Sequence, residues 1–101
     1  MSVLVKQVED KLCELVRDTA KKAMAAGELP EAELTDFKVE IPADRKNGDY
    51  STNAAMAWAR AFRRAPAMIA AAVTKNIDLE GTAFSSCEAA GPGFINFRLA
   101  D

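Results

Sequence analysis

The sequence contains no histidine, and its 101 residues include only two cysteines and one tryptophan. The missing histidine excludes a Ser-His or Cys-His nucleophile, a histidine general base and a histidine metal ligand. Cys13 and Cys87 are too few for a structural zinc site or for the disulfide framework of a small secreted domain. We therefore expect no catalytic residues and no metal site in this chain.

Long hydrophobic stretches are also missing. No apolar run approaches the ~18 residues of a membrane-spanning helix, and the mixed charge of the N-terminal segment does not fit a signal peptide. Half of the residues are hydrophobic and 28% are charged, which is typical of a folded chain. We expect a single domain over residues 1–101 that is cytoplasmic, free of the membrane and monomeric in isolation.

The chain as a whole has no large excess of positive or negative charge, but its segments differ in net charge. The formal net charge of −2 argues against nonspecific wrapping of nucleic acid. Residues 45–75 carry six basic residues and one acidic residue, whereas residues 1–44 carry six basic and ten acidic residues. The basic stretch could steer one face toward phosphate. Alternatively, its arginines simply complement the C-terminal end of a helix dipole.

Apolar periodicity predicts three helices. The first covers about 2–26, where Ser2 can cap the start and Gly27 can close the end. The second is expected over about 51–64, with Asp49 or Ser51 as its cap. Its inner face should contain Ala55, Trp58, Ala59 and Phe62. The third should begin at Pro66, which suits the first helical position. Its apolar face should contain Met68, Ile69, Ala72, Val73 and Ile77.

Alternating patterns predict the strands. Phe37, Val39 and Ile41 should face one way in a short strand. Two further strands, over 84–90 and 94–99, flank a Gly-Pro-Gly turn and should therefore pair antiparallel. The order helix, strand, helix, helix, strand, strand predicts an α+β fold, with an antiparallel sheet of about three to four strands and three helices packed on one face.

The last strand carries the most suggestive group of side chains. Its inward set should be Ile95, Phe97 and Leu99. Its outward set is then Phe94, Asn96 and Arg98, an aromatic ring, an amide and a guanidinium. RNA-binding sheets use such groups to stack on an unpaired base, to hydrogen-bond a base edge and to meet phosphate or a second base. The structural alternative is that the loop at 42–50 covers Phe94 and that Asn96 caps a turn.

Other candidate sites carry little chemistry. Gly91-Pro92-Gly93 is a weak phosphate-loop candidate because a strand, rather than a helix, follows it. Asp49 and Glu88 lack the spacing of an acid–base pair. Cys13 and Cys87 are expected to be packed thiols, since nothing indicates a depressed pKa.

Three blocks of sequence resemble a known family. They are Gly48 to Met56 (GDYSTNAAM), Pro66 with Ile69-Ala70, and Ala90 to Leu99 (AGPGFINFRL). Together they are similar to the N-terminal additional domain of arginyl-tRNA synthetase, over about residues 37–99. The resemblance implies an antiparallel sheet with helices on one side. It also implies contact with the D-loop at the outer corner of the L-shaped tRNA.

The resemblance implies roles for individual residues. The contacts come from the turn and strand that contain Gly91 and Gly93, where an aromatic at the Phe94 position stacks in the D-loop and an amide at the Asn96 position forms hydrogen bonds. Arg98 extends this set by strand alternation alone.

Other positions of the same blocks are expected to contribute less to RNA contact. Ala90 occupies a position where some members carry a polar side chain, which this sequence lacks. Asp49, Tyr50 and Asn53 are expected to cap and anchor the second helix rather than to touch RNA.

The catalytic elements of that family have no match here. A class I synthetase binds ATP through HIGH-like and KMSKS-like motifs, and the first of these requires histidine. The resemblance thus implies no cofactor for this segment, and ATP and Mg for the parent enzyme. It also implies a catalytic domain that continues beyond Asp101, so that this chain is an excised domain; the alternative is a free-standing relative. The implied partners are arginine tRNA, through its D-loop, and that catalytic domain.

An alternative function is a protein-interaction domain. It would dock on the catalytic domain or on another partner without RNA readout of its own. We expect its signature to be an exposed apolar patch that includes Met56, Trp58 and Met68.

Overall fold

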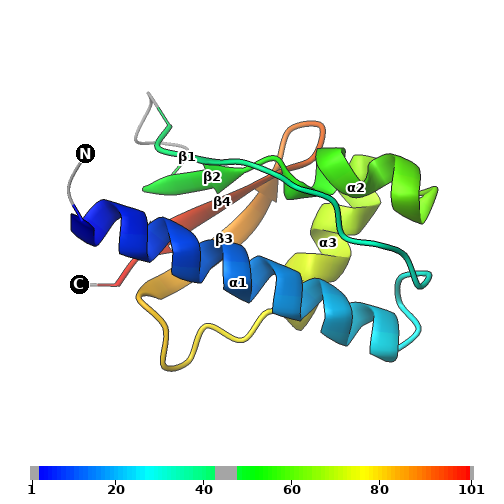
Figure 1. The fold of residues 1–101 in the computed structure, drawn as a ribbon, viewed down its shortest axis with the longest axis horizontal. Coiled ribbons are helices and arrows are strands. Elements are labelled where there is room, and N and C mark those ends of the chain that lie inside the picture. The colour runs from blue at the N-terminus through cyan, green and yellow to red at the C-terminus, as the bar shows by residue number, and fades with distance from the viewer. Residues whose placement is uncertain (1–2, 43–47, 101) are drawn as a thin grey trace.

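The computed structural model describes residues 3–42 and 48–100, with side chains from residue 6 onward. The elements in chain order are α1 (Val3–Ala25), β1 (Val39–Glu40), β2 (Tyr50–Thr52), α2 (Ala54–Phe62), α3 (Pro66–Asn76), β3 (Phe84–Ala90) and β4 (Phe94–Leu99). The strands form an antiparallel sheet in the order β1-β2-β4-β3, and the helices pack on one face of it (Figure 1). The expected α+β fold is confirmed. The expected cap Ser2 lies outside the described residues.

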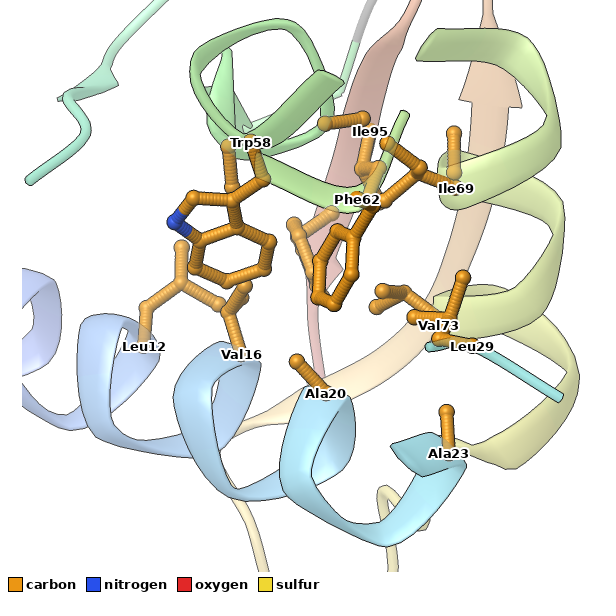
Figure 2. Packing of buried hydrophobic residues seen from close by; sticks show 14 of the residues in the cluster. Leu12, Val16, Ala20, Ala23, Leu29, Trp58, Phe62, Ile69, Val73 and Ile95 are labelled. Carbon is orange, nitrogen blue, oxygen red and sulfur yellow. The ribbon is translucent and has the colours of Figure 1, made fainter. Parts of the chain in front are cut away.

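α1 follows the sequence pattern closely. It buries one stripe at three- and four-residue steps, which consists of Leu12, Val16, Ala20 and Ala23. This stripe faces Trp58 and Phe62 of α2 and Val73 of α3 (Figure 2). Gly27 takes a φ of +79° just beyond the helix, as expected of a closing residue. Full burial of each large apolar side chain in this cluster contributes about 1.5–3 kcal/mol to folding.

α2 begins later than expected, because residues 50–52 form a strand. Tyr50 pairs with Phe97 and Thr52 with Ile95, so β2 lies between β1 and β4. Thr52 also fixes the end of the strand, since its Oγ1 donates to the carbonyl of Lys38 at 2.8 Å and accepts from the N–H of Ala54 at 3.2 Å. Backbone pairing on both sides outweighs the local helical pattern.

The ends of α2 differ from the prediction for related reasons. Asn53 is the N-cap but makes no capping hydrogen bond with its side chain, and neither Asp49 nor Ser51 is adjacent to the helix start. α2 stops at Phe62 because Arg63 turns into the left-handed region, at φ 55°, where its N–H donates to the carbonyl of Ala59. The inner face is close to expectation, with Ala54, Ala55, Trp58 and Phe62 buried.

Three positions predicted to face the core are exposed, namely Ile41, Met68 and, at the end of β4, Leu99. Ile41 is 56% exposed, because β1 contains only Val39 and Glu40 and the strand ends before it. Met68 is 59% exposed, because α3 buries Ile69, Ala70 and Val73 instead. The predicted start of α3 at Pro66 is confirmed.

β4 has two chemically distinct faces. Ile95 and Phe97 are fully buried toward the helices, and the ring of Phe84 lies 5.5 Å from that of Phe97. Phe94 and Leu99, at the two ends of the strand, are each 38% exposed. The antiparallel pairing of β3 with β4 is confirmed, with Cys87 opposite Phe97 and Ala90 opposite Phe94.

The turn between β3 and β4 is held against the helices at Gly93. This glycine has a φ of +140°, and a Cβ placed there would lie 2.5 Å from Cβ of Pro66 and 3.0 Å from Cγ of Met56. The turn therefore packs against the start of α3 and the first turn of α2. Only glycine allows this close approach.

A glycine comparison tests this contact. Gly93→Ala should lower the free energy of unfolding by about 2–5 kcal/mol, since backbone strain and overpacking add. Gly81→Ala should cost only about 1–2 kcal/mol, because Gly81 also has a positive φ (78°) but has no atom within 4 Å of the added Cβ. Urea unfolding of both variants measures the difference. Equal costs would contradict the packing of the turn on Pro66.

A second comparison tests the two faces of β4. Phe97→Ala should cost about 3–5 kcal/mol because it empties part of the core. Phe94→Ala should cost about 1 kcal/mol, since much of its ring is in contact with solvent. Thermal or urea unfolding of the two variants measures these costs. A Phe94 variant as unstable as the Phe97 variant would place Phe94 in the core.

Candidate nucleic-acid interface

The sheet face opposite the helices brings the predicted outward residues together. Phe94, Asn96 and Arg98 alternate along β4, which lies between β2 and β3. Asn96 is flanked by Ser51 of β2 on one side and Glu88 of β3 on the other. Arg98 is exposed and lies opposite Ser86. The structure therefore places an aromatic ring, an amide and a cation in one row, with Phe94 and Arg98 exposed and Asn96 largely buried between them.

Phe94 forms one wall of a hollow at the β2 end of this face. The other lining residues are Lys38, Glu40, Ser51, Thr52, Asn53 and Met56. The Phe94 ring also approaches the turn, since a Cβ added at Gly91 would lie 3.8 Å from its Cδ2 atom. A ring held on one side and open on the other is a suitable platform for a planar ligand. We call this depression the Phe94 hollow.

Asn96 is only 6% exposed, yet its amide forms no hydrogen bond with the rest of the described chain. None of the described buried side-chain nitrogen or oxygen atoms lacks a partner, so the amide atoms of Asn96 must reach the surface. They open into a second, smaller hollow that also contains Glu88 and Arg98. Within the described residues Asn96 therefore caps no turn, and its donors and acceptor point to where a ligand can reach them.

The two glycines of the turn occupy different environments. Gly91 is exposed at a φ of 56°, whereas Gly93 is buried against Pro66 and Met56. Gly91 thus offers its backbone to the open face beside Phe94, while Gly93 sets the shape of the turn. The covering loop considered for Phe94 falls partly on residues 43–47, which lie outside the described residues.

The side chains of the residues expected to anchor α2 mainly fasten strands, although Asn53 also occupies the N-cap position of the helix. Asp49 accepts a hydrogen bond from the N–H of Leu99 at 2.9 Å, and its own N–H donates to the carbonyl of Phe97 at 2.8 Å. Asn53 Oδ1 accepts from the N–H of Lys38 at 2.8 Å, which fixes β1 beside the start of α2. Tyr50 is buried, and that burial is the main cause of the raised pKa of its phenol. These residues hold the ends of β1 and β4 in place.

The cysteines show no sign of reactivity. Cys13 and Cys87 are both half-buried, and burial is the main cause of the raised pKa of each thiol. A raised pKa keeps the thiol protonated and weakly nucleophilic at neutral pH. Across 3–42 and 48–100, no group of three or more His, Cys, Asp or Glu residues is placed to hold a metal ion. No described helix is long and apolar enough to cross a membrane.

Sequence reasoning missed part of the Phe94 hollow. Asn53 and Met56 stand in the block from Gly48 to Met56 and could have been proposed from it, but Lys38 joins them only through the pairing of β1 with β2. The apolar patch expected for a protein-docking domain is wrong in part, because Trp58 is fully buried. Its indole N–H donates to the carbonyl of Thr35 at 2.8 Å, inside the fold.

Comparison with known proteins agrees with this architecture. Arginine–tRNA ligase of Acetivibrio thermocellus is 41% identical over 101 residues, which is 100% of this chain and 18% of that protein. The Staphylococcus aureus arginine–tRNA ligase is 42% identical over 96 residues, 95% of this chain and 16% of that protein. The chain therefore spans less than a fifth of the length of these relatives.

A solved structure and a family match complete the comparison. The arginyl-tRNA synthetase of Thermus thermophilus shares this fold with a TM-score of 0.58 and 24% identity, over 82% of this chain and 13% of that one. Residues 10–99 match the family described as the arginyl tRNA synthetase N terminal domain. This match covers most of the chain, and the chain therefore belongs to the family of arginyl-tRNA synthetase N-terminal domains.

Proposed function

We propose that this domain binds arginine tRNA through the D-loop, with the outer face of β4 as the contact surface. The observation that carries the proposal is the pairing of the half-exposed Phe94 ring with the Asn96 amide, which has no partner among the described residues. The ring would stack on an unpaired base, and the amide would hydrogen-bond a base edge. Arg98 would meet a phosphate or a second base, and the exposed backbone at Gly91 would border the stacked base.

The role of the domain would be positional. It would hold one corner of the tRNA while the catalytic domain of a parent class I arginine–tRNA ligase, with ATP and Mg, activates arginine and transfers it to the 3′ end. Selectivity follows from the cost of extrusion, because a D-loop base that is already unpaired needs less energy to leave its stack than a paired base. Such an enzyme works in the cytoplasm, and the isolated domain would be a monomer.

The affinity of the domain alone should be modest. A stacked base contributes about 1–3 kcal/mol, and one amide with a few phosphate contacts adds little more. We expect a Kd in the micromolar range or weaker at physiological salt. In the parent enzyme the domain would act mainly by raising the effective concentration of the tRNA.

Substitutions on β4 test the proposal. Phe94→Ala should weaken binding of arginine tRNA about 5- to 150-fold, as expected from the loss of one stacked base. Asn96→Ala should weaken it several-fold through lost hydrogen bonds. Leu99→Ala is the matched control, because Leu99 lies on the same strand and is also 38% exposed, but it alternates with the inward residues. Amide NMR titration of each variant measures both the Kd and the fold.

The outcome that contradicts the proposal is specific. A folded Phe94→Ala variant that binds arginine tRNA like the wild type would exclude stacking on this ring. If Leu99→Ala weakens tRNA binding as much as Phe94→Ala does, the face of β4 on which a side chain lies does not determine binding. Wild-type protein that shows no shifts at β4 would favour docking on another protein domain instead.

A further inference from the structure

The segment that contains α2 and α3 is depleted of negative charge. Residues 50–77 contain no Asp or Glu, and their basic residues are Arg60, Arg63, Arg64 and Lys75. Lys75 is neutralised by Glu28, whose carboxylate lies 2.6 Å from its Nζ atom. The three arginines are exposed, and none forms an ion pair with a carboxylate of the described chain. An uncompensated cluster of three guanidinium groups therefore remains at one end of α2.

The geometry of α2 directs this cluster away from the core. Trp58 and Phe62 point from α2 toward α1 and α3 (Figure 2). Met56 and Arg60 lie one turn apart on the opposite side of the helix, and Arg63 follows them near the next turn. Arg60 thus follows Met56 on the outer side of α2, and Arg63 and Arg64 come directly after the end of the helix.

Met56 connects this line to the proposed base-binding ring. Its side chain lines the Phe94 hollow together with Lys38, and it also lies against the position of Gly93 in the β3–β4 turn. Figure 1 shows this turn beside α2 at the same end of the sheet. The open side of Phe94 therefore leads past Met56 onto the arginines, which we call the α2 arginine stripe (Arg60, Arg63 and Arg64).

Acidic residues border the path on its other sides. Glu40 lies in the Phe94 hollow. The acidic segment 31–36 runs along the flank of α2, where Thr35 Oγ1 donates to the carbonyl of Ala57 at 3.3 Å. A polyanion that leaves the hollow would be repelled from these flanks and attracted along the arginine stripe.

We propose that the α2 arginine stripe binds the sugar–phosphate backbone of the RNA whose base stacks on Phe94. The inference rests on the proposed function and adds a second contact surface to it. Guanidinium groups bind phosphate oxygens with two parallel hydrogen bonds, and this contact does not depend on base sequence. The outer face of β4 would then select an unpaired base, and the stripe would fix the direction in which the RNA strand runs away from that base.

A charge-matched pair of double variants tests the stripe. Arg60→Gln with Arg64→Gln removes two exposed cations from the stripe, whereas Lys11→Gln with Lys21→Gln removes two exposed cations from α1. The Kd for arginine tRNA is measured at several salt concentrations. The stripe variant should bind about tenfold more weakly at low salt, and its slope of log K against log salt should be shallower by about 1–2. The α1 variant should keep the wild-type slope.

Two further variants separate the stripe from folding and from the proposed function. Arg60→Lys with Arg64→Lys keeps both charges and should restore most of the slope, which a purely structural role would not do. Phe94→Ala should weaken binding but keep the slope, because stacking releases few counterions.

An unchanged slope in the stripe variant, or an equal loss in the α1 variant, would overturn the stripe while Phe94 binding stands. If the stripe variant has a shallower salt slope but Phe94→Ala binds like the wild type, the base-stacking function is overturned and the stripe is supported as a phosphate surface. Wild-type protein without RNA binding at any salt would overturn both.

Discussion

The central position of β4 is the constraint on which the rest of the structure depends. A strand exposes alternate side chains on opposite faces, so the residues that hold the core also fix the outward residues between them. Ile95 and Phe97 are buried under the helices, and β2 and β3 pair with both edges of the strand. Phe94 and Asn96 therefore cannot change face without moving the core by one register step. The proposed binding surface is therefore fixed by the same packing that forms the core.

The helices support this surface, and Met56 of α2 lines part of it. Gly93 allows the β3–β4 turn to pack against Pro66 and Met56. The start of α3 therefore fixes the position of the turn that precedes Phe94. Asp49 fastens the far end of β4 through the N–H of Leu99. Both ends of the strand are thereby fixed, one by packing and one by a hydrogen bond. Ordering the site in advance leaves less conformational entropy to be lost on binding.

Sequence reasoning predicted the fold class, α1, α3, the β3–β4 hairpin and the alternation of β4, because each rests on a local period or a turn signal. It did not predict β2, because the three residues Tyr50 to Thr52 have no periodicity of their own and are a strand only through their two neighbours. The role of Asp49 was misassigned for the same reason, since its partner Leu99 is distant in sequence. Asn53 is the N-cap of α2 as a position, but its side chain bonds the distant Lys38 instead of the helix. The row of Phe94, Asn96 and Arg98 was predictable from alternation along β4. The hollow beside it was not, because Lys38 and Glu40 reach it only through the pairing of β1 with β2.

The charge distribution is compatible with the proposed binding of a polyanion, although the net charge of the domain is −2. Most carboxylates lie on α1 and in the segment that follows it, while α2 and α3 carry none. Electrostatic attraction depends on the field at the contact surface more than on the total charge, because salt screens charges farther away than about 8–10 Å. In the proposed complex, this separation of charge would orient the molecule, since the acidic segment 28–40 would be repelled by RNA while the arginines after α2 would be attracted to it. A uniformly basic domain would bind more strongly but without a preferred orientation.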